Sequence, residues 1–144
     1  MISSEKSYLA GFLDGDGSIY VRMKPNHTYR YNFQVIAYIA FFQSSKSRDA
    51  FCILCDKIGC GKLRTRKDGI LEYVISRQDA VYAFLNAIEP YLILKRDQAK
   101  LMRKILSQKS RVKNEKDFKN LMTLIDSFRE LNYSKNRKKR TLTP

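Results

Sequence analysis

Hydrophobic residues alternate with polar residues in four segments of the chain and recur at three- and four-residue spacing in five others. The alternation predicts strands over residues 18–24, 29–42, 61–66 and 71–76. The helical spacing predicts helices over residues 4–14, 47–58, 95–108 and 115–131, and one that begins after Ser76 and ends before Pro90. The order αββαββααα predicts an α+β fold in which one antiparallel sheet packs its apolar face against helices.

Several residues predict where these elements begin and end. Ser4, Ser47 and Ser76 are predicted N-caps, because a serine hydroxyl can accept a hydrogen bond from an unpaired amide of the first turn. Gly59 is predicted to end the second helix in the left-handed conformation. The Gly-Asp-Gly segment at residues 15–17 is predicted to stop the first helix.

The second face of the predicted sheet is polar. Basic and amide side chains predominate on it, and Glu72 is the exception: Arg22, Lys24, Arg30, Asn32, Gln34, Lys62, Arg64 and Arg66. These side-chain types bind the phosphates and base edges of nucleic acids. The alternative interpretation is an ordinary solvated sheet face, which the near absence of acids disfavours.

Composition supports a polyanionic partner. The chain has 144 residues, with 28 Lys and Arg against 14 Asp and Glu, and a formal net charge of +14. Nucleic acid is the usual partner of such a chain. Its length and 44% hydrophobic content predict one domain over residues 1–132, followed by a basic, mobile tail over residues 133–144. Because no membrane-length apolar run or secretory pattern is found, we expect an intracellular protein that is not secreted and has no membrane partner.

Residues 8–17 place small and acidic side chains together at the end of the first predicted helix. Gly11 and Gly15 are four residues apart, a spacing that lets two helix backbones approach closely. Asp14 and Asp16 lie where the helix dipole disfavours a carboxylate. A divalent cation bound by carboxylate and backbone carbonyl oxygens would reverse that disadvantage. The segment is not an EF-hand, because the required glycine and glutamate positions hold other residues.

The sequence of residues 9–17 (LAGFLDGDG) resembles the defining motif of the LAGLIDADG homing endonucleases. The resemblance includes Ser18-Ile19-Tyr20 after the motif, Lys24-Pro25-Asn26 in the first hairpin, and Leu94-Lys95-x-x-Gln98-Ala99. It extends from about Tyr8 to Leu131 and is strongest to small, intron-encoded members with one motif. It implies an αββαββα core with added C-terminal helices, whose sheet forms a DNA-binding saddle.

The resemblance also implies a homodimer in which the motif helices of two subunits pack at the two-fold axis. The expected interface residues are Leu9, Ala10, Gly11, Leu13 and Gly15. A symmetric pair supplies two sites, one for each DNA strand.

The resemblance places the catalytic metal at the end of the motif helix. Asp16 and the Gly15 carbonyl are expected to bind Mg²⁺, for which Mn²⁺ or Ca²⁺ can substitute. Gln43 and Lys95 match a polar and a basic residue of the active-site pocket and are expected to be catalytic with Asp16.

A second basic pocket residue is missing. Ser47 stands where relatives carry it, so either Lys46 or Arg48 takes that role or the helix cap has replaced it.

The implied activity is metal-dependent hydrolysis of one phosphodiester in each strand of double-stranded DNA. The target is a long pseudo-palindromic site used in intron homing, and the products carry short 3′ overhangs. The expected DNA-binding residues lie mainly on the polar sheet face: Tyr20, Arg22, Lys24, Asn26, Thr28, Arg30, Asn32, Gln34, Tyr38, Lys62, Arg64, Arg66, Glu72 and Val74. Two alternatives remain: a maturase that binds intron RNA and assists splicing, and a DNA-binding protein that does not cleave.

Overall fold

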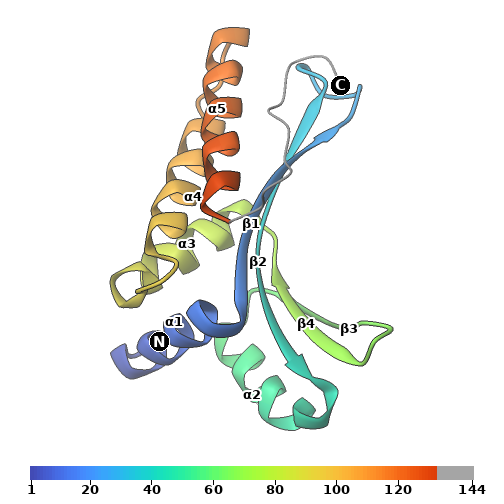
Figure 1. Cartoon of the computed structure of the whole chain (residues 1–144), viewed down its shortest axis with the longest axis vertical. Coiled ribbons are helices and arrows are strands. Elements are labelled where there is room, and N and C mark those ends of the chain that lie inside the picture. The colour runs from blue at the N-terminus through green and yellow to red at the C-terminus, as the bar shows by residue number, and fades with distance from the viewer. Residues whose placement is uncertain (133–144) are drawn as a thin grey trace.

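A curved antiparallel sheet forms the centre of the computed structural model, which describes residues 1–132 (Figure 1). Its strands are β1 (Gly17–Pro25), β2 (Phe33–Ser44), β3 (Lys62–Thr65) and β4 (Ile70–Ile75), in the order β1-β2-β4-β3. The predicted tail, residues 133–144, lies outside the described residues. All four predicted strands are present and pair antiparallel, although β2 begins later than predicted.

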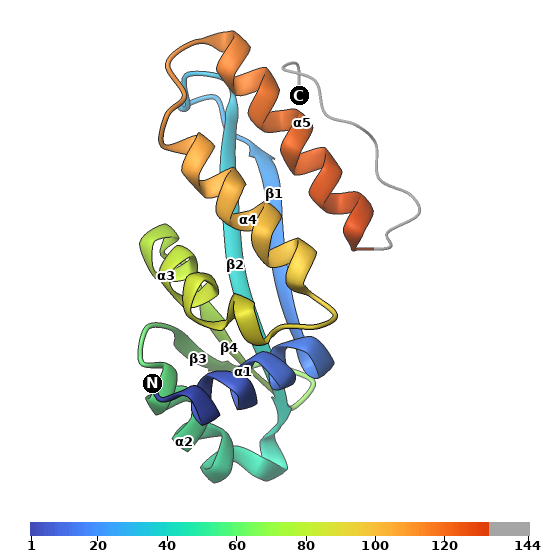
Figure 2. The same ribbon diagram turned by 90° about the vertical axis from the view of Figure 1, so that its left-hand side faces the viewer.

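Five α-helices accompany the sheet in the described part of the chain: α1 (Ser3–Asp16), α2 (Arg48–Ile58), α3 (Gln78–Ile88), α4 (Arg96–Lys109) and α5 (Glu115–Leu131). Short 3₁₀ turns, η1 (Ser45–Ser47) and η2 (Glu89–Tyr91), precede α2 and follow α3. The helices α1, α3, α4 and α5 lie along one face of the sheet, and no helix of residues 1–132 covers the other face (Figures 1 and 2). None of the helices within residues 1–132 is long and apolar enough to cross a membrane.

The core lies between the helices and the alternating apolar positions of the two long strands. Its strand residues include Ile19, Val21 and Met23 in β1 and Phe33, Val35, Ala37, Ile39 and Phe41 in β2. All of these side chains are buried, as the period of two predicts. The alternate residues of the same strands consequently point away from the helices.

The first hairpin differs from the prediction, because β2 begins at Phe33 and not at residue 29. The Asn26 side chain accepts hydrogen bonds from the backbone N–H and the hydroxyl of Thr28, at 3.0 and 2.7 Å. Asn32 has a φ of 66°, in the left-handed region that asparagine tolerates. These local interactions keep residues 26–32 in a loop, so Arg30 and Asn32 do not lie on the strand where the sequence placed them.

Several predicted helix ends also differ. Helix α1 begins at Ser3 and not after Ser4, and the Glu5 carboxylate accepts the Ile2 N–H at 3.1 Å. Ser47 precedes α2 without a capping hydrogen bond from its side chain. The prediction for Gly59 is confirmed: it has a φ of 73° and its N–H donates to a carbonyl of the last turn.

The start of α3 and the end of α1 are likewise shifted. Helix α3 is preceded by Arg77, whose guanidinium pairs with Asp79, so no capping box forms at Ser76. Helix α1 continues through Gly15 and ends at Asp16, two residues later than predicted.

An aromatic contact ties the hairpin loop to the C-terminal helices. The ring of Tyr31 stacks on Phe118 of α5, with centroids 4.8 Å apart and an interplanar angle of 20°. The Arg30 guanidinium lies 5.3 Å from the centroid of the same tyrosine ring. Because Phe118 is buried, the far end of the β1–β2 hairpin is held against α5.

We predict that Phe118→Ala destabilises this end of the molecule. Removing a buried phenylalanine costs about 3–5 kcal/mol of the free energy of unfolding, because its apolar contacts are lost and a cavity remains. Urea denaturation followed by circular dichroism measures this loss. Phe118→Leu keeps most of the buried volume and should cost distinctly less; equal losses for the two variants would contradict the packing role.

Candidate active site and nucleic-acid interface

Helix α1 passes directly into β1 without an intervening loop, and this junction carries the predicted acidic site. Asp16 is the last helical residue and Gly17 the first of the strand. A Cβ on Gly17 would lie 2.4 Å from Leu13 Cδ1 and 2.9 Å from Leu13 Cα. Glycine is therefore required here, because only its bare backbone can pass so close to the last helical turn.

The two aspartates of the motif have different environments. The Asp14 carboxylate accepts three backbone N–H groups, from Ile93 at 2.8 Å, Leu94 at 3.2 Å and Lys95 at 2.9 Å. The Asp16 side chain is exposed, and no group within residues 1–132 donates a hydrogen bond to its carboxylate. Asp14 is thus occupied within the protein, while Asp16 is available to a ligand.

Lys95 lies at the same helix end. Its ammonium group donates to the backbone carbonyl of Asp14 at 2.7 Å, and the residue is partly buried. The last carbonyls of a helix lack intrahelical donors and carry the negative end of the dipole, so a lysine here is electrostatically favoured. The structure thus brings Lys95 to the helix end that carries Asp16, although the two residues are far apart in the chain.

The donor set at this junction suits a hard divalent cation. The exposed Asp16 carboxylate and the Gly15 carbonyl, which lies in the last turn of α1, are oxygen ligands of the kind that Mg²⁺ and Ca²⁺ prefer. Residues 1–132 contain no group of three or more His, Cys, Asp or Glu side chains that could hold a metal. At this junction the chain therefore offers the Asp16 carboxylate and the Gly15 carbonyl as oxygen donors.

Gln43 lies near the same end of the sheet. Gly17 pairs with Phe41 across β1 and β2, so Gln43 lies two residues beyond the first pair of the ladder. Its Oε1 accepts the Ser44 N–H at 2.9 Å. The side-chain amide nitrogen remains able to donate to a water molecule or a phosphate oxygen.

The candidates for a second basic pocket residue are placed differently. Arg48 donates from its guanidinium to the Thr65 hydroxyl at 2.7 Å, which ties α2 to β3. Lys46 is exposed within η1. The Lys46 ammonium group donates no hydrogen bond to another side chain in the described part of the chain, unlike the Arg48 guanidinium.

The open face of the sheet carries most of the predicted DNA-binding residues. Tyr20 and Tyr38 are directly opposite each other on β1 and β2, with ring centroids 5.1 Å apart. Burial, together with Tyr20 and Glu72, raises the pKa of the Tyr38 hydroxyl. This hydroxyl therefore stays protonated and can donate a hydrogen bond over the physiological pH range.

An ion pair organises the β3–β4 side of this face. Arg64 donates from Nε and Nη2 to the same carboxylate oxygen of Glu72, at 2.7 and 2.6 Å. The Glu72 side chain is 12% exposed and that of Arg64 is 71% exposed. The Glu72 carboxylate thus orients the Arg64 guanidinium through Nε and Nη2, while most of the arginine side chain faces solvent.

Other predicted contacts are distributed around these pairs. On adjacent strands, Lys24 is opposite Gln34 and Lys62 is opposite Val74. Arg66 lies beyond the end of β3, in the turn, and pairs with Asp68 at 3.0 Å.

Helix α1 presents a surface different from the one expected. Leu9, Ala10 and Leu13 are buried in the chain's own core. Gly11 and Gly15 are exposed, and a Cβ on either would meet no atom of the described residues within 4 Å. Of the five residues expected at a dimer interface, only the two glycines present their helix face to solvent.

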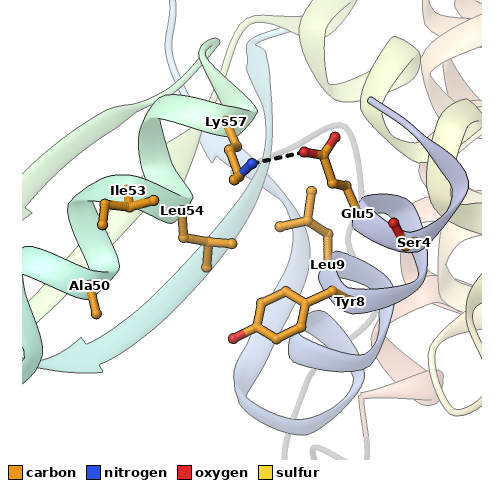
Figure 3. A pocket seen from close by; sticks show the side chains of 8 residues that line it. All are labelled: Ser4, Glu5, Tyr8, Leu9, Ala50, Ile53, Leu54 and Lys57. Carbon is orange, nitrogen blue, oxygen red and sulfur yellow. Dashed lines mark hydrogen bonds and ion pairs between the residues drawn. The ribbon is translucent and has the colours of Figure 1, made fainter.

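An apolar pocket adjoins this part of α1, between α1 and α2 (Figure 3). Tyr8, Leu9, Ile53 and Leu54 are among its lining residues, and its volume is about 330 Å³. The Glu5 carboxylate accepts a hydrogen bond from Lys57 at 2.8 Å across one end. Tyr8 and Ile53 are each 62% exposed, so apolar surface here remains in contact with water.

Comparison with known proteins identifies the family. The family model of the LAGLIDADG endonucleases matches residues 9–106. The DNA endonuclease I-CreI of Chlamydomonas reinhardtii is 38% identical over 132 residues, which cover 91% of this chain and 80% of that protein. The DNA endonuclease I-CvuI of Chlorella vulgaris is 33% identical over 102 residues, which cover 71% of this chain and 63% of that protein. The chain belongs to the LAGLIDADG endonuclease family.

A solved structure agrees with this assignment. The crystal structure of the homing endonuclease I-CvuI in complex with the I-CreI target, in the presence of 2 mM Mg, superposes with a TM-score of 0.86 and 30% identity. The match covers 94% of this chain and 86% of that one. The same endonuclease has also been crystallised with its own target in the presence of 2 mM Ca. The αββαββα core implied by the motif is confirmed.

Proposed function

We propose that this protein is a homodimeric, site-specific endonuclease that cuts both strands of DNA with a divalent metal ion, in the manner of intron homing. The observation that carries the proposal is the position of Asp16. Its carboxylate is exposed, engages no other group in residues 1–132, and lies where the motif helix passes directly into β1.

The sheet face supports double-stranded DNA as the substrate. It combines exposed cations with hydrogen-bonding groups on adjacent strands, among them Arg22, Lys24, Gln34, Lys62 and Arg64. β-Strands can enter the major groove, where arginine and glutamine side chains distinguish base pairs. The relative I-CvuI has been crystallised with DNA targets, which is consistent with this use of the face.

Two observations support a homodimer formed through α1. Gly11 and Gly15 each lower helix propensity by about 1 kcal/mol relative to alanine, yet no contact with residues 1–132 requires a glycine at either position. Exposed apolar side chains surround this helix: Tyr8 and Ile53, and also Ile93 and Leu94, which are 81% and 77% exposed. A second α1 packed against the glycines would cover these side chains and bring a second Asp16 to the site.

The chemistry follows from the residues at the end of α1. When bound by Asp16 and the Gly15 carbonyl, Mg²⁺ would supply Lewis-acid activation of water and stabilise charge on the phosphate. The Lys95 ammonium places a positive charge beside the same helix end, where it offsets charge that develops on the phosphate. Gln43 retains a free amide donor that can orient water.

The proposal predicts that Asp16→Asn abolishes cleavage without loss of DNA binding. The substitution removes a charged ligand but keeps the size of the side chain, and we expect a rate loss of at least about 10³-fold. The target is first selected from a randomised duplex library with Mg²⁺, and cleavage is then measured on it under single-turnover conditions. Binding is measured in Ca²⁺. Asp97→Asn, an exposed residue of α4, is the matched control and should cleave normally.

The same variant separates the proposal from its alternatives. A maturase that binds intron RNA, or a regulator that only binds DNA, has no need of the Asp16 carboxylate. A wild-type chain that splices or binds but does not cleave would favour one of them. Full cleavage by Asp16→Asn would exclude this residue as the metal ligand.

For the homodimer, we predict that Gly11→Leu yields a folded monomer. The monomer has space for the side chain, so helical circular dichroism should be preserved, but the second helix would be kept away. Sedimentation velocity measures the change in mass. Asn120→Leu adds the same side chain to an exposed position of α5 and should leave the dimer intact. A dimeric Gly11→Leu protein would refute the proposed interface.

For the sheet face, we predict that Arg64→Ala relaxes base preference at one position of each half-site. The expected loss of discrimination is about 1–3 kcal/mol, because one side chain that contacts base edges is removed. Binding to a panel of singly substituted duplexes measures it. Lys100→Ala on α4 serves as a control that lies away from the sheet face. An equal loss of affinity for every duplex would show that Arg64 contacts phosphate.

A further inference from the structure

The loop before α4 is fixed by a single carboxylate. Asp14 Oδ2 accepts the N–H groups of Ile93 and Leu94, and Oδ1 accepts that of Lys95. These three amides are consecutive and come from a segment about eighty residues away in the chain. A carboxylate near the C-terminal end of a helix is unfavourable by itself, so the three amides compensate for its position in α1.

Lys95 contacts Asp14 a second time, through its own side chain. While the Lys95 amide donates to the Asp14 side chain, the Lys95 ammonium donates to the Asp14 backbone carbonyl at 2.7 Å. Lysine has a long stem with many rotamers, and these two bonds fix both ends of it. The position of the positive charge near Asp16 is therefore determined by Asp14.

The same loop carries apolar side chains outward. Ile93 and Leu94 donate their amides to Asp14 and are 81% and 77% exposed. One carboxylate thus orients the basic residue of the pocket and two apolar residues of the surface that we assign to the second subunit.

We infer that Asp14 is a positioning residue, which acts through Lys95 and does not bind the metal. This inference rests on the proposed endonuclease function and adds a division of labour between the two aspartates of the motif. Asp16 contacts the ligand, and Asp14 sets the geometry around it. Its carboxylate oxygens already accept three amides, and those bonds fix the orientation of the carboxylate.

A double-mutant cycle on the full-length protein tests the inference. Asp14→Asn removes the charge and replaces one acceptor oxygen with a donor, and it should slow single-turnover cleavage by about 30- to 100-fold at saturating Mg²⁺. In a Lys95→Met background the same substitution should slow cleavage by less than about 3-fold, since the lysine through which Asp14 acts is gone. The Mg²⁺ concentration for half-maximal rate should stay within about 2-fold of wild type, because no metal ligand has changed.

Further variants separate positioning from general destabilisation. Asp14→Glu keeps an anionic acceptor on a longer stem and should recover part of the rate that Asp14→Asn loses. Amide hydrogen exchange at residues 93–95 should be faster in Asp14→Asn than in wild type. Asp97→Asn, in the first turn of α4, is the matched substitution and should change neither the rate nor the exchange of these amides.

Three results would overturn the inference. Equal rate losses from Asp14→Asn with and without Lys95 would show that Asp14 acts independently of the lysine. A large increase in the half-saturating Mg²⁺ concentration would make Asp14 a metal ligand. An Asp14→Asn protein that cleaves as wild type does would remove any role. If the wild-type chain fails to cleave its selected target, the proposed function itself is wrong. If Asp14→Asn does not fold, Asp14→Glu takes its place in the cycle, with the same coupling to Lys95 required.

Discussion

The direct passage of α1 into β1 is the constraint on which the candidate site depends. A loop at this point would let the acidic end of the helix move relative to the sheet. Gly17 removes that freedom, because the strand starts against the last helical turn, at a distance that a Cβ would not permit. The backbone of Asp16 is therefore held in a fixed relation to the end of α1 and the start of β1, while its carboxylate is exposed.

Several acidic side chains are paired within the protein, whereas most basic side chains of the sheet face are exposed to solvent. Several acids of the described chain are occupied by a neighbour: Asp14 by backbone amides, Glu72 by Arg64, Glu5 by Lys57 and Glu89 by Arg103. The basic residues of the sheet face are mostly exposed. A polyanion that approaches this face meets exposed cations, and Glu72, the acid predicted on the same face, is already paired with Arg64.

The sequence alone predicts the buried positions where a strand has a regular alternating pattern and packs against helices on one side only. The alternation in β1 and β2 gave the buried face correctly, since each strand has helices on one side only. It failed at the hairpin, where Asn26 and Asn32 stabilise a local loop that competes with the strand. Leu9, Ala10 and Leu13 were expected at a dimer interface because the motif resembles that of a homodimeric family, whereas in the chain itself they are buried in the core. The role of Asp14 was not predicted, as its partners lie far along the chain and are backbone amides, which any sequence would supply.

The anchoring of the hairpin loop depends on contacts at both of its ends. Tyr31 and Phe118 hold the loop from the helix side, while Asn26, Thr28 and Arg30 lie within the loop itself. Asn26 accepts two hydrogen bonds from Thr28, and Arg30 lies over the Tyr31 ring, so the side chains of the hairpin tip also maintain the conformation of the loop. Substitutions at this tip would therefore change the local shape of the loop, while the contact between Tyr31 and Phe118 would keep the hairpin attached to α5.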